Sequence, residues 1–278
     1  MARMRVTFDS NLYRRVTDPT RFPSDPAHDA FTKIHAAILD GTIQPFLCAT
    51  IVTLEAIGRD VRGDYLADNR VKIETQERTG KSGAIEVQML MGPDNSLHPG
   101  LPEILERWLE AALALGFKFL AAPRIGQPRP PILNDPDRFA SLEQVDFELL
   151  GAVSRAIEAR GLGIAQAKSI ASGIARRVPH HHVQNVHWSA LLREAADIHE
   201  RRAIARAIAE WSDADAIAAH LAYHGDVFCT EDIGRSASGP SVLSPEARSW
   251  LGEDYGLVIR SATQLAAEVG VTKLKTAI

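Results

Sequence analysis

Five acidic side chains stand where a parallel α/β sheet would bring them together. Asp9 directly follows the first apolar strand and Asp232 follows a later one. Glu55 falls on the helix after the second strand, and Asp213 and Asp215 begin the helix that precedes the strand of Asp232. Ligands of open parallel sheets bind beyond the carboxyl ends of the strands, where the strand order reverses. Clustered carboxylates repel one another and are best satisfied by a hard cation such as Mg²⁺ or Mn²⁺, so we predict an acidic metal site.

Each acid also has a purely structural interpretation. Asp213 and Asp215 would cap a helix and complement its dipole, and Asp9 and Asp232 would be turn residues. The metal hypothesis depends on the arrival of carboxylates from four separate segments of the chain at one sheet edge.

The elements that must position these acids alternate between strand and helix. Short apolar strands are expected at residues 5–8, 43–49, 117–120, 226–230 and 257–259. Amphipathic helices are expected at residues 27–39, 101–115, 141–160, 163–177, 189–211 and 212–224, with further helices starting at Thr50, Ser244 and Ser261. Apolar strands separated by amphipathic helices predict a three-layer α/β fold with a parallel sheet covered on both faces.

Two segments depart from this alternation. Residues 71–74 and 84–89 alternate apolar with polar side chains around a Gly-containing turn, which predicts a β-hairpin. Five prolines between residues 122 and 138 predict an extended excursion.

Composition is that of an ordinary globular chain. The 278 residues are 45% apolar and 24% charged, with a net charge of −4, which speaks against wholesale binding of nucleic acid but leaves room for a local basic patch. Cys48 and Cys229 fall in apolar strands and are expected as buried thiols. No apolar stretch approaches the ~20 residues of a membrane span, and no signal peptide is apparent, so we expect a cytoplasmic protein without membrane contact.

The strand ends and the acids together resemble the PIN-domain nucleases. The resemblance covers roughly residues 5–60, 101–121 and 210–268 and is carried by the segments Phe8-Asp9-Ser10-Asn11, Thr50-Ile51-Val52-Thr53-Leu54-Glu55, an Asp-Ala-x-x-Ala helix, Val227-Phe228-Cys229-Thr230-Glu231-Asp232 and Leu257-Val258-Ile259-Arg260-Ser261. Single motifs in this set are weak, and their order and spacing carry the specificity.

The resemblance implies a sheet of order 3-2-1-4-5 and a metal-dependent ribonuclease that hydrolyses single-stranded RNA. Carried over residue by residue, it implies Mg²⁺ or Mn²⁺ ligands at Asp9, Glu55, Asp215 and Asp232. Thr230 would orient Asp232 or a water, and Asn11 would touch the scissile phosphate. The cation would supply the activated water, so no protein nucleophile is needed.

The third acidic position is ambiguous. Asp213 and Asp215 point about 200° apart around a helix and cannot both face one site. The Asp-Ala-Ile-Ala-Ala context favours Asp215, while Asp213 stays a candidate catalytic residue. PIN domains are also about half as long as this chain, so we interpret residues 1–278 as one PIN-like domain with a hairpin insertion at about 62–98 and a helical insertion at about 122–188.

The helical insertion leads into a locally basic stretch. Between residues 176 and 206 six arginines (Arg176, Arg177, Arg193, Arg201, Arg202, Arg206) face three acids, with His180, His181, His182, His187, His199 and Trp188 among them. Cations and an aromatic ring beside an acidic pocket suit single-stranded RNA, although a solvated helix face has the same pattern.

Other functions are weighed against the nuclease. One alternative is a non-catalytic scaffold that binds RNA or protein. Another is the toxin of a toxin–antitoxin pair, in which the partner protein fills the acidic pocket. The sequence is also compatible with a homo-oligomer. Adjacent histidines at 180–182 lack the spacing of a helical metal site, and Thr79-Gly80-Lys81-Ser82 lacks the upstream glycine of a P-loop.

Overall fold

A computed structural model of the chain describes residues 3–68, 71–79, 85–122, 129–179, 186–234 and 240–276. Its strands are β1 (Met4–Phe8), β2 (Ile43–Cys48), β3 (Val71–Thr79), β4 (Ile85–Pro93), β5 (Lys118–Leu120), β6 (Val227–Cys229) and β7 (Ile259–Arg260). Its α-helices are α1 (Tyr13–Thr17), α2 (His28–Leu39), α3 (Arg62–Ala67), α4 (Glu103–Ala114), α5 (Phe147–Ala159), α6 (Ile164–Ala175), α7 (Ile198–Ala222), α8 (Pro245–Tyr255) and α9 (Ala262–Thr276). A π-helical turn, η2 (Ile51–Glu55), follows β2, and a 3₁₀ segment, η8 (Trp188–Glu194), precedes α7.

The central sheet is five-stranded and parallel throughout. Its order is β5-β2-β1-β6-β7, so the sequence-based prediction of an α/β fold with strand order 3-2-1-4-5 is confirmed. In the register, Val6 of β1 lies opposite Pro45 on one side and Val227 on the other. The chain moves outward from β1 to β2 and β5 and then returns to the other side of β1, which makes the β1/β6 boundary the topological switch point.

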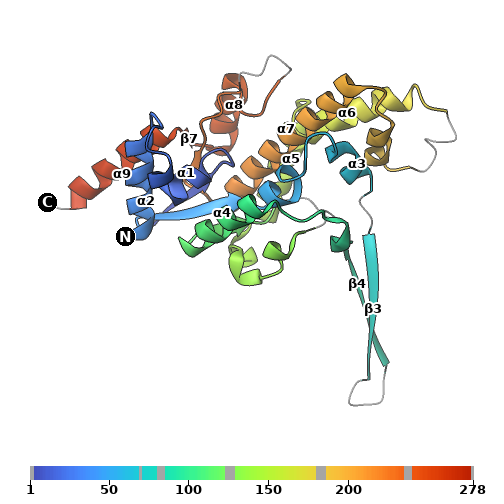
Figure 1. The fold of residues 1–278 in the computed structure, drawn as a ribbon, viewed down its shortest axis with the longest axis horizontal. Coiled ribbons are helices and arrows are strands. Elements are labelled where there is room, and N and C mark those ends of the chain that lie inside the picture. Colours follow the sequence, from blue (N-terminus) through green and yellow to red (C-terminus); the bar gives the residue numbers. More distant parts are fainter. Residues whose placement is uncertain are drawn as a thin grey trace.

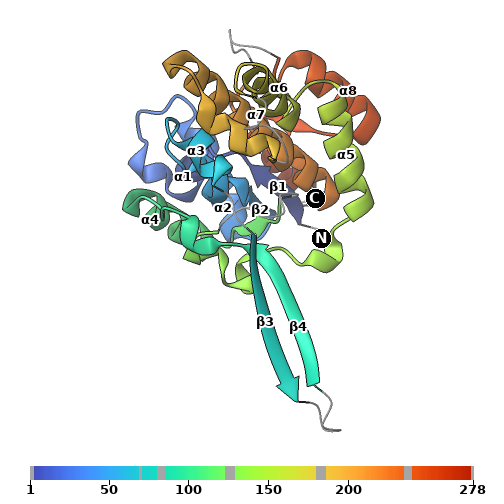
Figure 2. The ribbon, with the colours of Figure 1, turned by 90° about the vertical axis from the view of Figure 1, so that its right-hand side faces the viewer.

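Apolar side chains cover both faces of this sheet. Val6 and Phe8 belong to the core packed by α1, α2 and α9, whereas Phe228 belongs to the core packed by α5, α7 and α8. Phe46 of β2 packs with Tyr223 at the end of α7. Fully burying one such side chain contributes about 1.5–3 kcal/mol to the stability of the fold. Because successive side chains of a strand point to opposite faces, each face of the sheet has its own apolar surface for helices to cover. The helical layers appear on either side of the strands in Figures 1 and 2.

A buried histidine of α7, His220, packs against the sheet. His220 Nδ1 lies 2.8 Å from Thr7 Oγ1 in β1, and the ring meets Phe228 edge-on. Burial, and secondarily the charge of Arg5, lowers the pKa of His220 to about 3, so the ring is neutral at physiological pH. Gly225 passes so close that a Cβ there would lie 2.3 Å from the imidazole, which explains a glycine at this turn.

The β3–β4 hairpin extends away from the sheet as a two-stranded antiparallel arm (Figures 1 and 2). The sequence predicted this hairpin, and the strands run longer than expected because the cross-strand pairing continues from Val71 opposite Pro93 to Thr79 opposite Ile85. Val87 and Met89 on the arm are 57% and 63% exposed.

The helix caps predicted at Ser244 and Ser261 are confirmed, and the one predicted at Thr50 is wrong. Ser244 caps α8, and Ser261 with Gln264 forms a reciprocal capping box at α9, as the sequence indicated. Thr50 was expected to cap a helix but makes no side-chain cap bond. Cys48 and Cys229 are buried free thiols.

Residues 198–222 form one 25-residue helix, α7, so the predicted break between helices 189–211 and 212–224 is wrong, and residues 188–194 form the 3₁₀ segment η8. Asp197 is the N-cap, since its side chain accepts a hydrogen bond from Glu200 N at 2.8 Å. Ser212 and Asp213, which looked like a helix start, lie in the interior of α7 because their side chains serve tertiary contacts described below.

The proline-rich excursion was expected to be extended without packing, and its described part is more ordered than that. Residues 131–133 and 136–138 form single 3₁₀ turns with proline at their starts, and Ile132 and Leu133 are buried in the core. In the part of the chain that the structure describes, no helix is both long enough and apolar enough to cross a bilayer.

Candidate active site

The carboxyl ends of β1 and β6 are joined through one threonine. Thr230 Oγ1 donates to Asp9 Oδ2 at 2.6 Å and accepts a hydrogen bond from Asp232 N at 2.9 Å. Asp9 also accepts from Ser10 N at 2.6 Å and from Asn11 Nδ2 at 2.9 Å. These bonds orient Asp9 at the switch point. Thr230 was predicted to orient Asp232 or a water, and its hydroxyl instead bonds the side chain of Asp9 and the backbone N of Asp232.

Neighbouring acids raise the proton affinity of Asp9. Burial comes first, followed by the charge of Glu55 and, to a smaller extent, that of Asp232, and together they raise the pKa of Asp9 to about 6 against the hydrogen bonds that favour the ionised form. Glu55 reaches this group from η2, where Ser212 Oγ of α7 donates to its Oε1 at 2.9 Å.

Asp213 on α7 interacts electrostatically with the acids at the sheet edge. Burial raises the pKa of Asp213 well above its usual range, and the charges of Asp9, Glu55, Glu210 and Asp232 raise it further. The structure thus brings Asp213 into electrostatic contact with the carboxylates that the sequence singled out.

Asp215, which we preferred as the metal ligand, takes a different position. It is 6% exposed and its charge acts on the thiol of Cys48 in β2. Both acids lie inside α7, where two residues of helix separate their side chains by about 200° around the axis. Of the two acids, Asp213 is the one whose pKa is raised by the charges of Asp9, Glu55 and Asp232, and we use it in the proposal below.

Two further side chains border the acids and were missed in the sequence. Glu210 lies one turn before Asp213, accepts hydrogen bonds from Val242 N and Ser241 Oγ, and has a pKa raised to about 7, chiefly by burial. Its spacing of three residues from Asp213 would have revealed it, had the helix been recognised as continuous.

The second missed side chain is a buried arginine. Arg62, 6% exposed, donates to the backbone oxygens of Ile57 at 2.9 Å and Glu55 at 2.7 Å. The charges of Glu55 and Asp213 act on its guanidinium, so it supplies positive potential beside the acids. A lone arginine between two polar turns gave no sequence signal for this position.

The basic stretch is partly neutralised and lies along the other half of α7. Arg177 pairs with Glu200 at 2.6 Å, Arg201 with Asp64 at 3.2 Å, and Arg193 with Asp68. Trp188 packs on Trp211, with ring centroids 5.8 Å apart. Twelve residues of helix separate Arg201 from Asp213, about 18 Å along the axis. His180, His181, His182 and the turn at 80–83 lie outside the described residues.

As the side chains stand, the described residues contain no three His, Cys, Asp or Glu groups that converge on a single metal position. The donor chemistry nevertheless suits a hard cation, because burial and the charges of Glu55 and Asp232 raise the pKa of both Asp9 and Asp213 at one sheet edge.

Comparisons with protein-family models, curated proteins and solved structures find no match for this chain. Its function must be inferred from its own residues.

Proposed function

We propose that the chain is a phosphodiesterase that depends on a divalent cation. The observation that carries this proposal is the gathering of acids at the switch point of a parallel sheet, where Thr230 links Asp9 to the backbone of Asp232 and the charges of Glu55 and Asp232 act on Asp9 and Asp213. Binding Mg²⁺ or Mn²⁺ relieves that repulsion, and the oxygen-only donor set is the one these cations prefer.

More particularly, we propose a PIN-type endoribonuclease that hydrolyses single-stranded RNA. The strand order 3-2-1-4-5, which the family resemblance implied, supports this assignment. A bound cation supplies a water of lowered pKa and neutralises charge on the leaving oxygen. The RNA substrate, the cation and the cytoplasmic location belong to the proposal.

The chain's own residues have separable tasks. Asp9 and Asp213 would hold the cation, and Glu55 and Asp232 would move toward them, since no three acids converge beforehand. Thr230 keeps Asp9 oriented through its 2.6 Å bond. The side chain of Asn11, exposed and bonded to Asp9 at 2.9 Å, would turn to a phosphate oxygen of the substrate.

Cleavage of a labelled single-stranded RNA in Mn²⁺ tests the proposal. We expect cleavage by the wild type, none in EDTA, and loss to background in Asp9→Asn, which preserves size and removes the charge. Retention of the fold by Asp9→Asn, read by circular dichroism, is the control.

Full activity of Asp9→Asn would refute the assignment. Binding of RNA without cleavage would favour the scaffold alternative. If a small protein encoded next to the gene inhibited RNA cleavage, the chain would be a nuclease toxin and that protein its antitoxin.

A further inference from the structure

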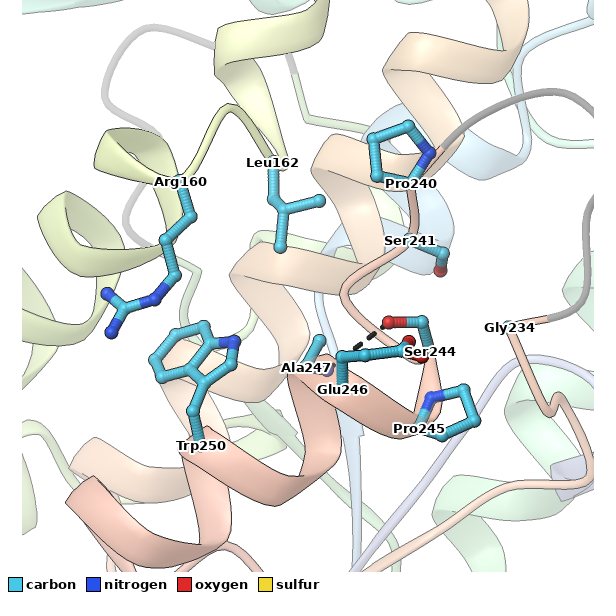
Figure 3. A pocket seen from close by; sticks show the side chains of 10 residues that line it. All are labelled: Arg160, Leu162, Gly234, Pro240, Ser241, Ser244, Pro245, Glu246, Ala247 and Trp250. Carbon is cyan, nitrogen blue, oxygen red and sulfur yellow. Dashed lines mark hydrogen bonds between the residues drawn. The ribbon is translucent and has the colours of Figure 1, made fainter.

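A cavity of about 450 Å³ opens where α8 meets the end of α5. Figure 3 shows Arg160 and Trp250 on one side of it and Ser241, Ser244 and Pro245 on the other, with Leu162 between them. Its volume falls in the range of ligand pockets, about 300–1,000 Å³.

The walls of this cavity combine flat apolar surface with hydroxyl groups. The Arg160 guanidinium lies 4.0 Å from the centroid of the Trp250 ring and is held there by Asp254 at 3.6 Å. Ser244 Oγ accepts from Ala247 N at 3.2 Å as the cap of α8. Indole and guanidinium planes are the surfaces on which unpaired nucleobases stack, and nearby hydroxyls can bond to base edges.

A hydrogen bond connects the lining of the cavity to one of the acidic residues. Gly234, which lines it, donates from its backbone N to Asp232 Oδ1 at 2.8 Å. Gly234 has φ +64°, and a Cβ there would lie 2.4 Å from Leu243 C and Ser244 N, so glycine is required for this close approach to the start of α8.

Two side chains reinforce this connection. Arg248 of α8 donates to the backbone oxygens of Leu243, at 2.7 Å, and Asp232. Glu210, one turn from Asp213, accepts from Val242 N beside the cavity. Hydrogen bonds therefore join the lining of the cavity to the segment that carries Asp232 and to the part of α7 that carries Asp213.

We propose that this cavity is a subsite for one unpaired nucleobase of the RNA substrate, stacked against the Arg160–Trp250 pair. The inference rests on the proposed function and deepens it, because it names the part of the substrate that is recognised and where. Recognition through ring faces makes the subsite selective for single strands and tolerant of base identity.

Single-nucleotide abasic substitution tests the subsite. Binding of a short fluorescent single-stranded RNA is measured in EDTA, where cleavage does not interfere, with each nucleotide replaced in turn by an abasic one. In the wild type one position should be sensitive, with Kd rising about 5- to 150-fold, the range expected for one stacked base. Trp250→Ala should bind intact and abasic RNA equally, whereas Trp250→Phe should keep most of the discrimination.

Trp108→Ala is the matched control. Trp108 on α4 also carries an arginine on its ring, Arg21 at 5.2 Å from the centroid, but it packs with the core on the other face of the sheet. This variant should discriminate as the wild type does.

The outcomes separate the two proposals. Equal discrimination by Trp250→Ala and the wild type, or no sensitive position in the wild type, overturns the subsite, and cleavage in Mn²⁺ would then leave the nuclease assignment standing. Position-specific binding that depends on Trp250, without any cleavage in Mn²⁺, supports the subsite and overturns the nuclease.

Discussion

Asp9→Asn should stabilise the cation-free protein at alkaline pH. The folded protein raises the pKa of Asp9 to about 6, against an ordinary value of 3.8, through burial and the charges of Glu55 and Asp232. A shift of this size lowers the free energy of unfolding by at most about 3 kcal/mol once Asp9 is fully ionised. Asparagine removes the charge and keeps an oxygen that can accept from Ser10 N.

The sign of the pH dependence follows from the direction of the shift. Because the folded state binds the proton of Asp9 more tightly than the unfolded chain, ionised Asp9 destabilises the fold above pH about 6. This destabilisation is relieved as the pH falls toward about 4. Asparagine does not ionise, so the stability advantage of Asp9→Asn should grow by about 1.5 kcal/mol between pH 5 and pH 8.

Urea unfolding in EDTA at pH 5, 6.5 and 8 measures this advantage, with the exposed Asp60→Asn as the control for a general change in charge. An advantage of Asp9→Asn that stays constant with pH, or that shrinks as the pH rises, would refute the assignment of repulsion to this cluster.

Three further predictions follow from the same geometry. Mn²⁺ at about 100 times its Kd should raise the unfolding free energy of the wild type by about 2.7 kcal/mol and leave Asp9→Asn unchanged; equal gains in both would contradict binding at this site. Asp213→Asn should abolish RNA cleavage whereas Asp215→Asn retains it at a lower melting temperature, and the reverse order of activities would restore Asp215 as the ligand. Gly225→Ala should lower stability by about 1–3 kcal/mol in urea unfolding, because the new methyl group meets the buried ring of His220; an unchanged midpoint would show that the turn can shift.

The pattern of apolar and acidic residues along the sequence could predict the part of the site that lies at strand ends. Asp9 follows β1 directly and Asp232 lies three residues after β6, because the end of a short apolar run marks the carboxyl end of a strand. The sheet order came from the family resemblance, since the spatial order of strands depends on long-range pairing that apolar patterning does not encode.

The helical part of the site could not be read in the same way. Ser212 and Asp213 have the composition of a helix start, yet Ser212 donates to Glu55, 157 residues earlier in the chain, and both lie inside α7. Which face of α7 meets the sheet is set by tertiary packing, so the sequence alone could not choose between Asp213 and Asp215. Glu210 was missed for the same reason.

Anomalous scattering from Mn²⁺ in crystals of the wild type tests the central claim most directly. We expect an anomalous difference peak at the carboxyl ends of β1 and β6, contacted by Asp9 and Asp213. A peak bound by Asp215, or no peak at this edge of the sheet at saturating Mn²⁺, would contradict the proposed metal site.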